Sequence, residues 1–130
     1  MNNAVLIGRL TKDPEMRYLP NGTPYTTFIL AVDRQLSKDK KKELEDQGKQ
    51  TADFINIVVW GKQAENCANH LAKGLKVAVQ GRIQSRSWEA EDGSRRYTTE
   101  VVATSVEFLE WKNKDDDIPG FTSIDEDVPF

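Results

Sequence analysis

The segment from Leu75 to Trp88 alternates between two kinds of side chain. Arg82, Arg86 and Trp88 fall in the same phase of this alternation. Because successive side chains of a β-strand point to opposite faces, the segment predicts a strand with arginines and an aromatic ring on one face. The opposite phase is aliphatic and is expected to face a core: Leu75, Val77, Val79 and Ile83. Guanidinium groups bind phosphates and flat rings stack on bases, so the first face has the chemistry to bind nucleic acid.

The segment from residue 52 to residue 60 carries two more aromatic residues, Phe54 and Trp60, in one phase. The other phase is aliphatic: Ile55, Ile57 and Val59. Six residues at roughly 3.3 Å each place the two rings about 20 Å apart on the same face of a strand. We therefore expect two separate platforms for stacking.

Isolated rings between cations suit a single strand better than a duplex, because unpaired bases expose their flat faces. Stacking tolerates every base, so such a surface would bind with little sequence preference. The simpler interpretation is that each ring packs in the core or anchors a subunit interface, as most strand aromatics do. The arginines in phase with Trp88 favour nucleic acid there, and Trp111 is assigned to packing.

The composition offers little for catalysis or metal binding. The chain has one cysteine, Cys67, and one histidine, His70, so it has no internal disulfide and no cysteine-cluster zinc site. No nucleophile has a base placed beside it by the sequence pattern. We therefore expect a protein without enzymatic activity, bound metal or cofactor.

Five strand patterns are separated by turns and one helix. The strands are expected at 3–10, 25–32, 52–60, 75–88 and 96–109. Residues 62–73 place Ala64, Cys67, Ala68 and Leu71 on one stripe, which predicts a short helix between the third and fourth strands, with Gly74 placed to end it. Asp92 and Gly93 predict a two-residue hairpin loop.

The charged segment 34–51 is expected to be a long mobile loop with at most a frayed helical turn. Five strands and one helix are too few for a sandwich, which usually needs about seven strands. The sequence therefore predicts an all-β, five-stranded OB-fold barrel.

The 130 residues suit one domain, over residues 1–112, followed by a disordered acidic tail over 113–130. The tail has one base and six acids, a net charge of −5, whereas the preceding residues have 17 bases and 15 acids, a net charge of +2. The low overall pI therefore does not exclude a polyanion as ligand. The first residues carry no basic region and no long apolar stretch, and nowhere do about 18 apolar residues run together, so we expect a soluble cytoplasmic protein with no membrane contact.

Four segments resemble the bacterial single-stranded-DNA-binding protein family, usually called SSB. They are Asn3–Tyr18, Ala52–Glu65, Gly81–Trp88 and Tyr97–Val102. The resemblance implies an OB fold, a homotetramer, no enzymatic activity, and single-stranded DNA as the ligand. It also implies roles in replication, recombination and repair.

The resemblance also implies which residues bind DNA. The stacking positions of the family fall on Phe54, Trp60 and Trp88, and its basic contacts fall on Lys62, Lys73 and Arg86. We add Arg9, Arg34 and Arg82 to this set. A further stacking position falls on Leu36, which packs against a base but cannot stack, so we expect a weaker contribution there.

The chain ends in a short segment that resembles the partner-docking tip of the family: Asp125, Glu126, Asp127, Val128, Pro129 and Phe130. A terminal ring with its carboxylate suits an apolar pocket with a basic rim on replication and repair enzymes. A solubilising acidic tail is the alternative, but it gives no reason for an apolar end. The similar segment 115–121 is interpreted as linker. The tail also has the charge to occupy the basic face when DNA is absent.

Two other classes of protein remain open. An OB-fold RNA binder of the cold-shock or tRNA-binding kind would share the aromatic and basic face. A protein adaptor that binds no nucleic acid is the second alternative.

Overall fold

The computed structural model describes residues 1–110. The predicted acidic tail and its tip, and the last two residues of the predicted domain, lie outside this range. The elements in chain order are β1 (Ala4–Leu10), β2 (Glu15–Tyr18), β3 (Pro24–Asp33), α1 (Lys38–Asp46), β4 (Ala52–Trp60), α2 (Lys62–His70), β5 (Lys76–Glu89) and β6 (Arg95–Phe108).

Five of the six strands close into a barrel. The order around it is β1, β5, β6, β4 and β3, and β3 returns to β1 through the pairs Arg9–Ala31 and Leu10–Leu30. Every pair is antiparallel except β4 with β6, which is parallel. This arrangement confirms the predicted all-β OB-fold barrel, and its five strands correspond to the five strand patterns.

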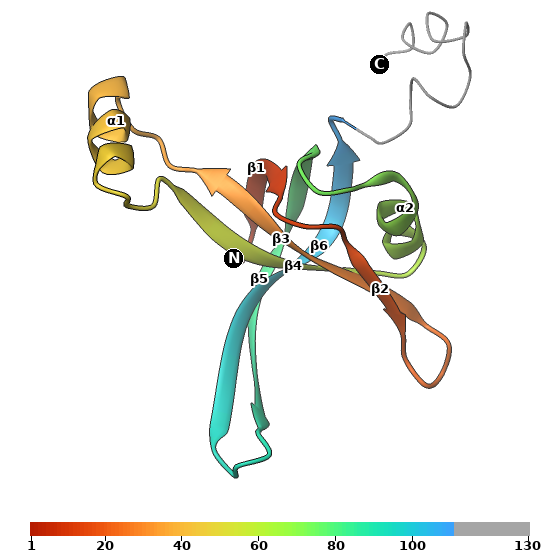
Figure 1. Cartoon of the computed structure of the whole chain (residues 1–130). Coiled ribbons are helices and arrows are strands. Elements are labelled where there is room, and N and C mark those ends of the chain that lie inside the picture. The colour runs from red at the N-terminus through yellow and green to blue at the C-terminus, as the bar shows by residue number, and fades with distance from the viewer. Residues whose placement is uncertain (111–130) are drawn as a thin grey trace, which may run out of the picture.

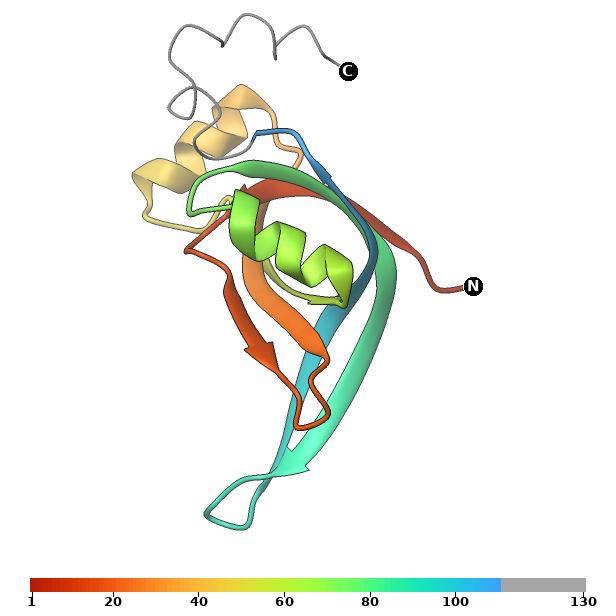
Figure 2. The ribbon, with the colours of Figure 1, turned by 90° about the vertical axis from the view of Figure 1, so that its right-hand side faces the viewer.

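The core fills the barrel and reaches one helix. Its buried members include Phe28, Leu30, Ile57, Val77 and Val79. Helix α2 lies across one end of the barrel (Figure 2) and inserts Ala64 and Cys67 into the same cluster. The buried hydroxyl of Thr26 donates to the carbonyl oxygen of Ala64 at 2.7 Å and ties β3 to this helix. The predicted helix is therefore confirmed, and it ends at His70.

Two elements were not predicted. The short strand β2 pairs with the start of β3 after a turn at Leu19–Thr23. Helix α1 forms where we predicted an irregular loop, so that prediction is wrong for residues 38–46. Ser37 caps the helix by accepting a hydrogen bond from the Lys40 N–H at 3.2 Å. No residue of α1 is buried and the helix projects from the barrel (Figure 1), so no apolar stripe marks it in the sequence.

Strands β5 and β6 continue beyond the barrel as a long hairpin (Figure 1). We call residues 85–99 the hairpin arm, because β5 and β6 there pair only with each other among residues 1–110. Five residues separate the two strands, and the Ala90 N–H donates to the Ser94 carbonyl at 2.8 Å. The loop closed by this pair therefore has three residues, 91–93, rather than the two predicted, and Gly93 in it has φ 86°.

Ile83 lies near the base of the hairpin arm and is 48% exposed. The prediction that it faces the core is wrong. Its phase is the inward one, but it lines an apolar cavity of about 330 Å³ with Leu6 and Ile55, away from the buried residues that pack against α2. Alternation sets the direction of a side chain and does not show where the barrel ends.

The barrel depends on a close strand approach at Gly81, beside a register shift between β5 and β6. A Cβ atom at Gly81 would overlap the carbonyl oxygen of Val102, and one at Gly8 would overlap that of Ala31. Glycine is therefore required at both positions by the space available.

No helix within residues 1–110 has the length and apolar character needed to span a membrane.

Candidate nucleic-acid interface

The outward side chains of β3, β4, β5 and β6 form one surface, which we call the outer face. One row across it, from β5 to β3, is Gln84, Glu100, Asn56 and Ile29. The next row is Arg82, Val102, Val58 and Thr27. Along the hairpin arm, Arg86 lies opposite Thr98 and Trp88 lies opposite Arg96. The strand pairing therefore places three arginines and Trp88 on one face.

None of the three predicted platform rings is sealed in the core. Phe54, Trp60 and Trp88 are 56%, 41% and 43% exposed. Between Phe54 and Trp60 on the same face of β4, the side chain of Val58 is only 7% exposed. Phe54 and Trp60 lie toward opposite ends of β4 and Trp88 lies on the hairpin arm, so the three rings are exposed at separate places.

Each ring on β4 has a different neighbour on β3. Trp60 is paired with Tyr25, and the two ring centroids are 5.1 Å apart at 35°. Phe54 lies opposite Ala31, a small residue. Tyr25 was not among the predicted site residues, because its position beside Trp60 depends on the register between two strands. That register is the only signal that would have identified it.

Trp88 is in contact with a predicted cation. The Arg86 Cζ lies 5.2 Å from the centroid of the Trp88 ring, within the range of a cation–π interaction. The side chain of Arg86 is 58% exposed. A guanidinium can bind a phosphate while an exposed indole beside it stacks on the neighbouring base.

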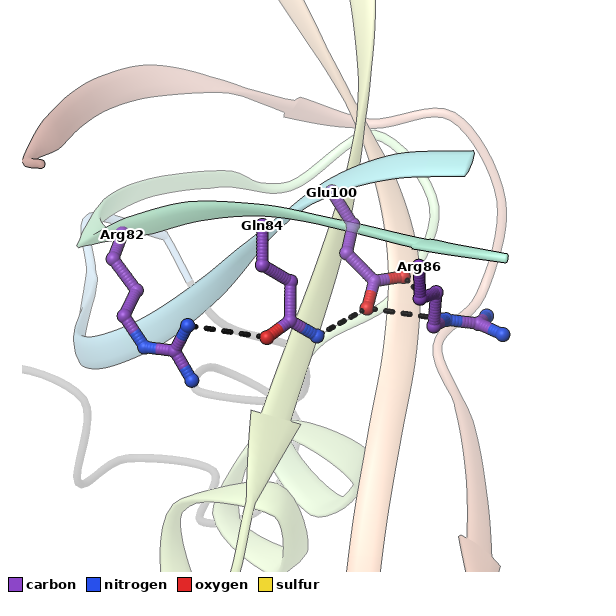
Figure 3. A network of polar contacts seen from close by, with 4 residues as sticks. All are labelled: Arg82, Gln84, Arg86 and Glu100. Atoms are coloured by element: carbon purple, nitrogen blue, oxygen red, sulfur yellow. Dashed lines mark hydrogen bonds and ion pairs between the residues drawn. The ribbon is translucent and has the colours of Figure 1, made fainter. Parts of the chain in front are cut away.

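A buried acid joins the polar side chains of this surface (Figure 3). The Glu100 carboxylate accepts a hydrogen bond from Gln84 Nε2 at 2.9 Å and contacts Arg86 Nε at 3.3 Å through both oxygens. Gln84 Oε1 in turn accepts from Arg82 Nη1 at 3.1 Å. Glu100 was not predicted as a site residue. The available signal was an acid within the otherwise uncharged strand segment 97–106, and its basic neighbour Arg86 is set by the register between β5 and β6.

A polar cavity opens on the same surface. It has a volume of about 270 Å³ and is lined by outward side chains of β3, β4, β5 and β6 and by the segment before β2. Its polar lining consists of Lys12, Glu15, Thr27, Asn56, Arg86, Thr98 and Glu100. Two cations, two acids and three neutral hydrogen-bonding side chains therefore surround a hollow beside the base of the hairpin arm.

Arg9 and Arg34 make ion pairs away from Trp88. Arg9 Nη1 donates to Glu110 Oε1 at 2.8 Å and to the Gly74 carbonyl at 2.9 Å, and the hydrogen bond from Arg9 lowers the pKa of Glu110. Arg9 pairs with the start of β5, so Trp88 lies twelve residues further, roughly 40 Å along the strand. Arg34 donates to Asp53 Oδ1 at 2.9 Å, next to Phe54 in sequence.

Three other predicted residues lie at the start of a helix or between elements. Lys62 begins α2, two residues after Trp60, and its side chain is 84% exposed. Lys73 is exposed after α2, where its N–H donates to Asp13 Oδ1 at 2.9 Å. Leu36 is half-buried between β3 and α1. The structure thus brings together Arg82, Arg86 and Trp88, and distributes the remaining candidates along the barrel.

The single thiol of the chain lies in the core and not on the outer face. Cys67 is fully buried, and burial raises its pKa to about 12, so the thiol stays protonated at neutral pH. Residues 1–110 contain no cluster of three histidine, cysteine or acidic side chains arranged to hold a metal ion. Exposed rings and hydrogen-bond donors suit the bases and phosphates of an unpaired strand.

Comparison with known proteins agrees with this interpretation. A profile of the single-strand binding protein family matches residues 1–109, which include every strand of the barrel. The chain is 57% identical to the single-stranded DNA-binding protein of Clostridium tetani, over 98% of this chain and 83% of that protein. It is 52% identical to single-stranded DNA-binding protein 2 of Clostridium acetobutylicum, over the full length of both chains.

We predict that Trp88→Ala weakens binding to single-stranded oligonucleotides of any sequence by about 1–3 kcal/mol, because one stacking platform is lost. The matched control is Tyr97→Ala. Tyr97 is 74% exposed on the opposite face of the same hairpin arm, and its removal should leave the affinity nearly unchanged. Affinities are measured by anisotropy of labelled oligo(dT). Equal losses in the two variants would show that the outer face is not the binding face.

Proposed function

The chain belongs to the single-strand binding protein family, and we propose that it binds single-stranded DNA through the outer face with little sequence preference. The observation that supports this proposal is the exposure of three separate rings, Phe54, Trp60 and Trp88, with arginines beside the last. Each ring stacks on one base, and the arginines bind the phosphates between them. Bound in this way, the strand is protected during replication, recombination and repair.

This function requires no reaction at the protein, so we propose a binding protein that acts in the cytoplasm at sites where DNA is unpaired. Rings that stack accept any base, whereas sequence readout would need fixed polar groups aimed at base edges. The outer face carries its rings at both ends of β4 and on the hairpin arm. A strand that visits all three must follow a path across the barrel.

We also propose a homotetramer, and two features of β1 support it. The edge of β1 from Ala4 to Ile7 that faces away from β5 has no neighbouring strand within residues 1–110. A free edge offers its backbone groups to another strand, and antiparallel pairing of β1 with a second copy gives a symmetric contact. Val5 and Ile7 add an apolar outward surface, 66% and 53% exposed. Two such dimers make the tetramer.

We propose that the C-terminal tip, residues 125–130, recruits partner enzymes of replication and repair. Its support comes from the sequence: three acids, then an apolar residue, a proline, and a terminal phenylalanine. The Phe130 ring enters an apolar pocket while its carboxylate and the acids meet a basic rim. In this proposal the barrel binds DNA and the C-terminal tip binds the partner enzymes.

Binding to DNA is tested by titrating intrinsic tryptophan fluorescence with oligo(dT) and oligo(U) at several salt concentrations. We expect tighter binding to oligo(dT), and an affinity that falls linearly on a log–log plot against salt because phosphate contacts release counterions. Equal or tighter binding to oligo(U) would assign the protein to RNA instead. A flat salt plot would exclude phosphate contacts, and no binding to either strand would leave the adaptor as the better explanation.

Assembly is tested with Ile7→Lys, which places a charge in the proposed contact between β1 strands. Size-exclusion chromatography with light scattering should give a tetramer for the unmodified chain and smaller species for the variant. The control is Glu43→Lys, which adds a lysine on the exposed helix α1 and should remain tetrameric. A tetramer that persists in Ile7→Lys would place the interface elsewhere.

Removal of Phe130 should abolish the retention of replication and repair enzymes from a bacterial extract, as identified by mass spectrometry on the immobilised protein. Affinity for oligo(dT) should stay within about twofold, because the outer face is intact. The matched control is Phe121→Ala in the similar internal segment, which has no terminal carboxylate and should retain the same enzymes. Retention without Phe130 contradicts the proposed docking role.

A further inference from the structure

An acid lies in the middle of the surface that we propose for DNA. Glu100 occupies the outward phase of β6, in the row between Gln84 and Asn56, and only 5% of it is exposed. A carboxylate at this place repels phosphates, and its burial costs free energy unless hydrogen bonds compensate. A carboxylate at this position therefore needs a role that outweighs both the repulsion of phosphates and the cost of burial.

Glu100 holds Arg86 by one nitrogen only. The ion pair is made through Nε, at 3.3 Å from both carboxylate oxygens. The two terminal nitrogens of the guanidinium make no hydrogen bond to any group of residues 1–110. Arginine has five N–H donors, so the four on the terminal nitrogens remain for a phosphate. The carboxylate therefore fixes this side chain without blocking its binding edge.

The same arginine is held from a second side by Trp88. Its Cζ lies 5.2 Å from the ring centroid, and the side chain remains 58% exposed. A long side chain loses rotamer freedom when it binds a ligand, and that loss weakens binding. Contacts with Glu100 and Trp88 remove much of this freedom before DNA arrives.

Glu100 also sets the orientation of the Gln84 amide. Gln84 Nε2 donates to the carboxylate at 2.9 Å, so the amide oxygen must point the other way, where it accepts from Arg82 Nη1 at 3.1 Å. One carboxylate thus orders Arg82, Gln84 and Arg86, three successive outward residues of β5 (Figure 3).

We propose that Glu100 is a positioning residue of the DNA-binding surface, which holds Arg86 and the Gln84–Arg82 pair ready for phosphates of the bound strand. The inference rests on the proposed function and deepens it. It makes a prediction opposite to that of simple electrostatics. Neutralising an acid on a surface that binds a polyanion should strengthen binding, whereas loss of a positioning residue should weaken it.

The test is Glu100→Gln, which keeps the size of the side chain and removes its charge. We expect the affinity for oligo(dT) to fall roughly threefold to tenfold, the range for releasing one or two ordered side chains. The slope of log affinity against log salt should decrease in magnitude by about 0.7, the value for one phosphate contact on a single strand. A purely structural role would leave this slope unchanged.

The matched control is Glu107→Gln, on the same strand. Glu107 is exposed and outward, and it has no ion pair among the described residues. Its neutralisation should leave the affinity unchanged or slightly higher. In an Arg86→Ala background, Glu100→Gln should cause a smaller further loss than in the wild type, because only the Gln84–Arg82 pair is then left for it to position.

Glu100→Asp, which keeps the charge and withdraws it by one methylene, should also weaken binding, and it carries the test if Glu100→Gln does not fold. Unchanged or tighter binding by a folded variant, with wild type binding normally, would overturn this inference alone. Failure of the wild-type protein to bind oligo(dT) would overturn the proposed function and the inference together.

Discussion

Closure of the barrel is the constraint on which the binding surface depends. When β3 returns to β1 at Arg9 and Leu10, the inward phase of every barrel strand has one small interior to fill. Aliphatic residues, Phe28 and α2 occupy it. A large ring in the outward phase then has no interior available, and near the end of a strand it is covered less by its neighbours than Val58 is at the centre. Exposure of Phe54 and Trp60 follows from the pleat and the closure together.

The sequence predicted those features that depend on one strand or one helix at a time. Alternation placed Phe54, Trp60 and Trp88 outward, and an apolar stripe located α2. Features that depend on pairing between strands were missed, such as Tyr25 beside Trp60 and Glu100 beside Gln84. Helix α1 was missed for another reason: it buries no side chain, so its stability comes from its cap and local propensity, which leave no periodic signal.

The predicted basic residues also show that the sequence does not reveal contacts between strands. Arg82 and Arg86 were chosen by phase and lie on the outer face. Arg9 and Arg34 were chosen by residue type, and each makes an ion pair that the sequence could not reveal, with Glu110 and Asp53. Exposed ion pairs contribute little stability and exchange readily, so neither pair fixes its arginine firmly. What they lack is the fixed orientation that Arg86 has.

The fixed orientation of Arg86 is connected to the way the hairpin arm joins the barrel. A two-stranded ribbon is marginally stable by itself, and the arm is joined to the barrel through the row of Gln84, Glu100 and Asn56. Glu100 is the buried polar group of this row, and its partners lie on the strand that leads to Trp88. The hydrogen bonds that order the arginines therefore also join the arm to the barrel at its base. Arg86 belongs to the arm and contacts the Trp88 ring, so the Glu100 carboxylate at the base of the arm is linked to that ring through one side chain.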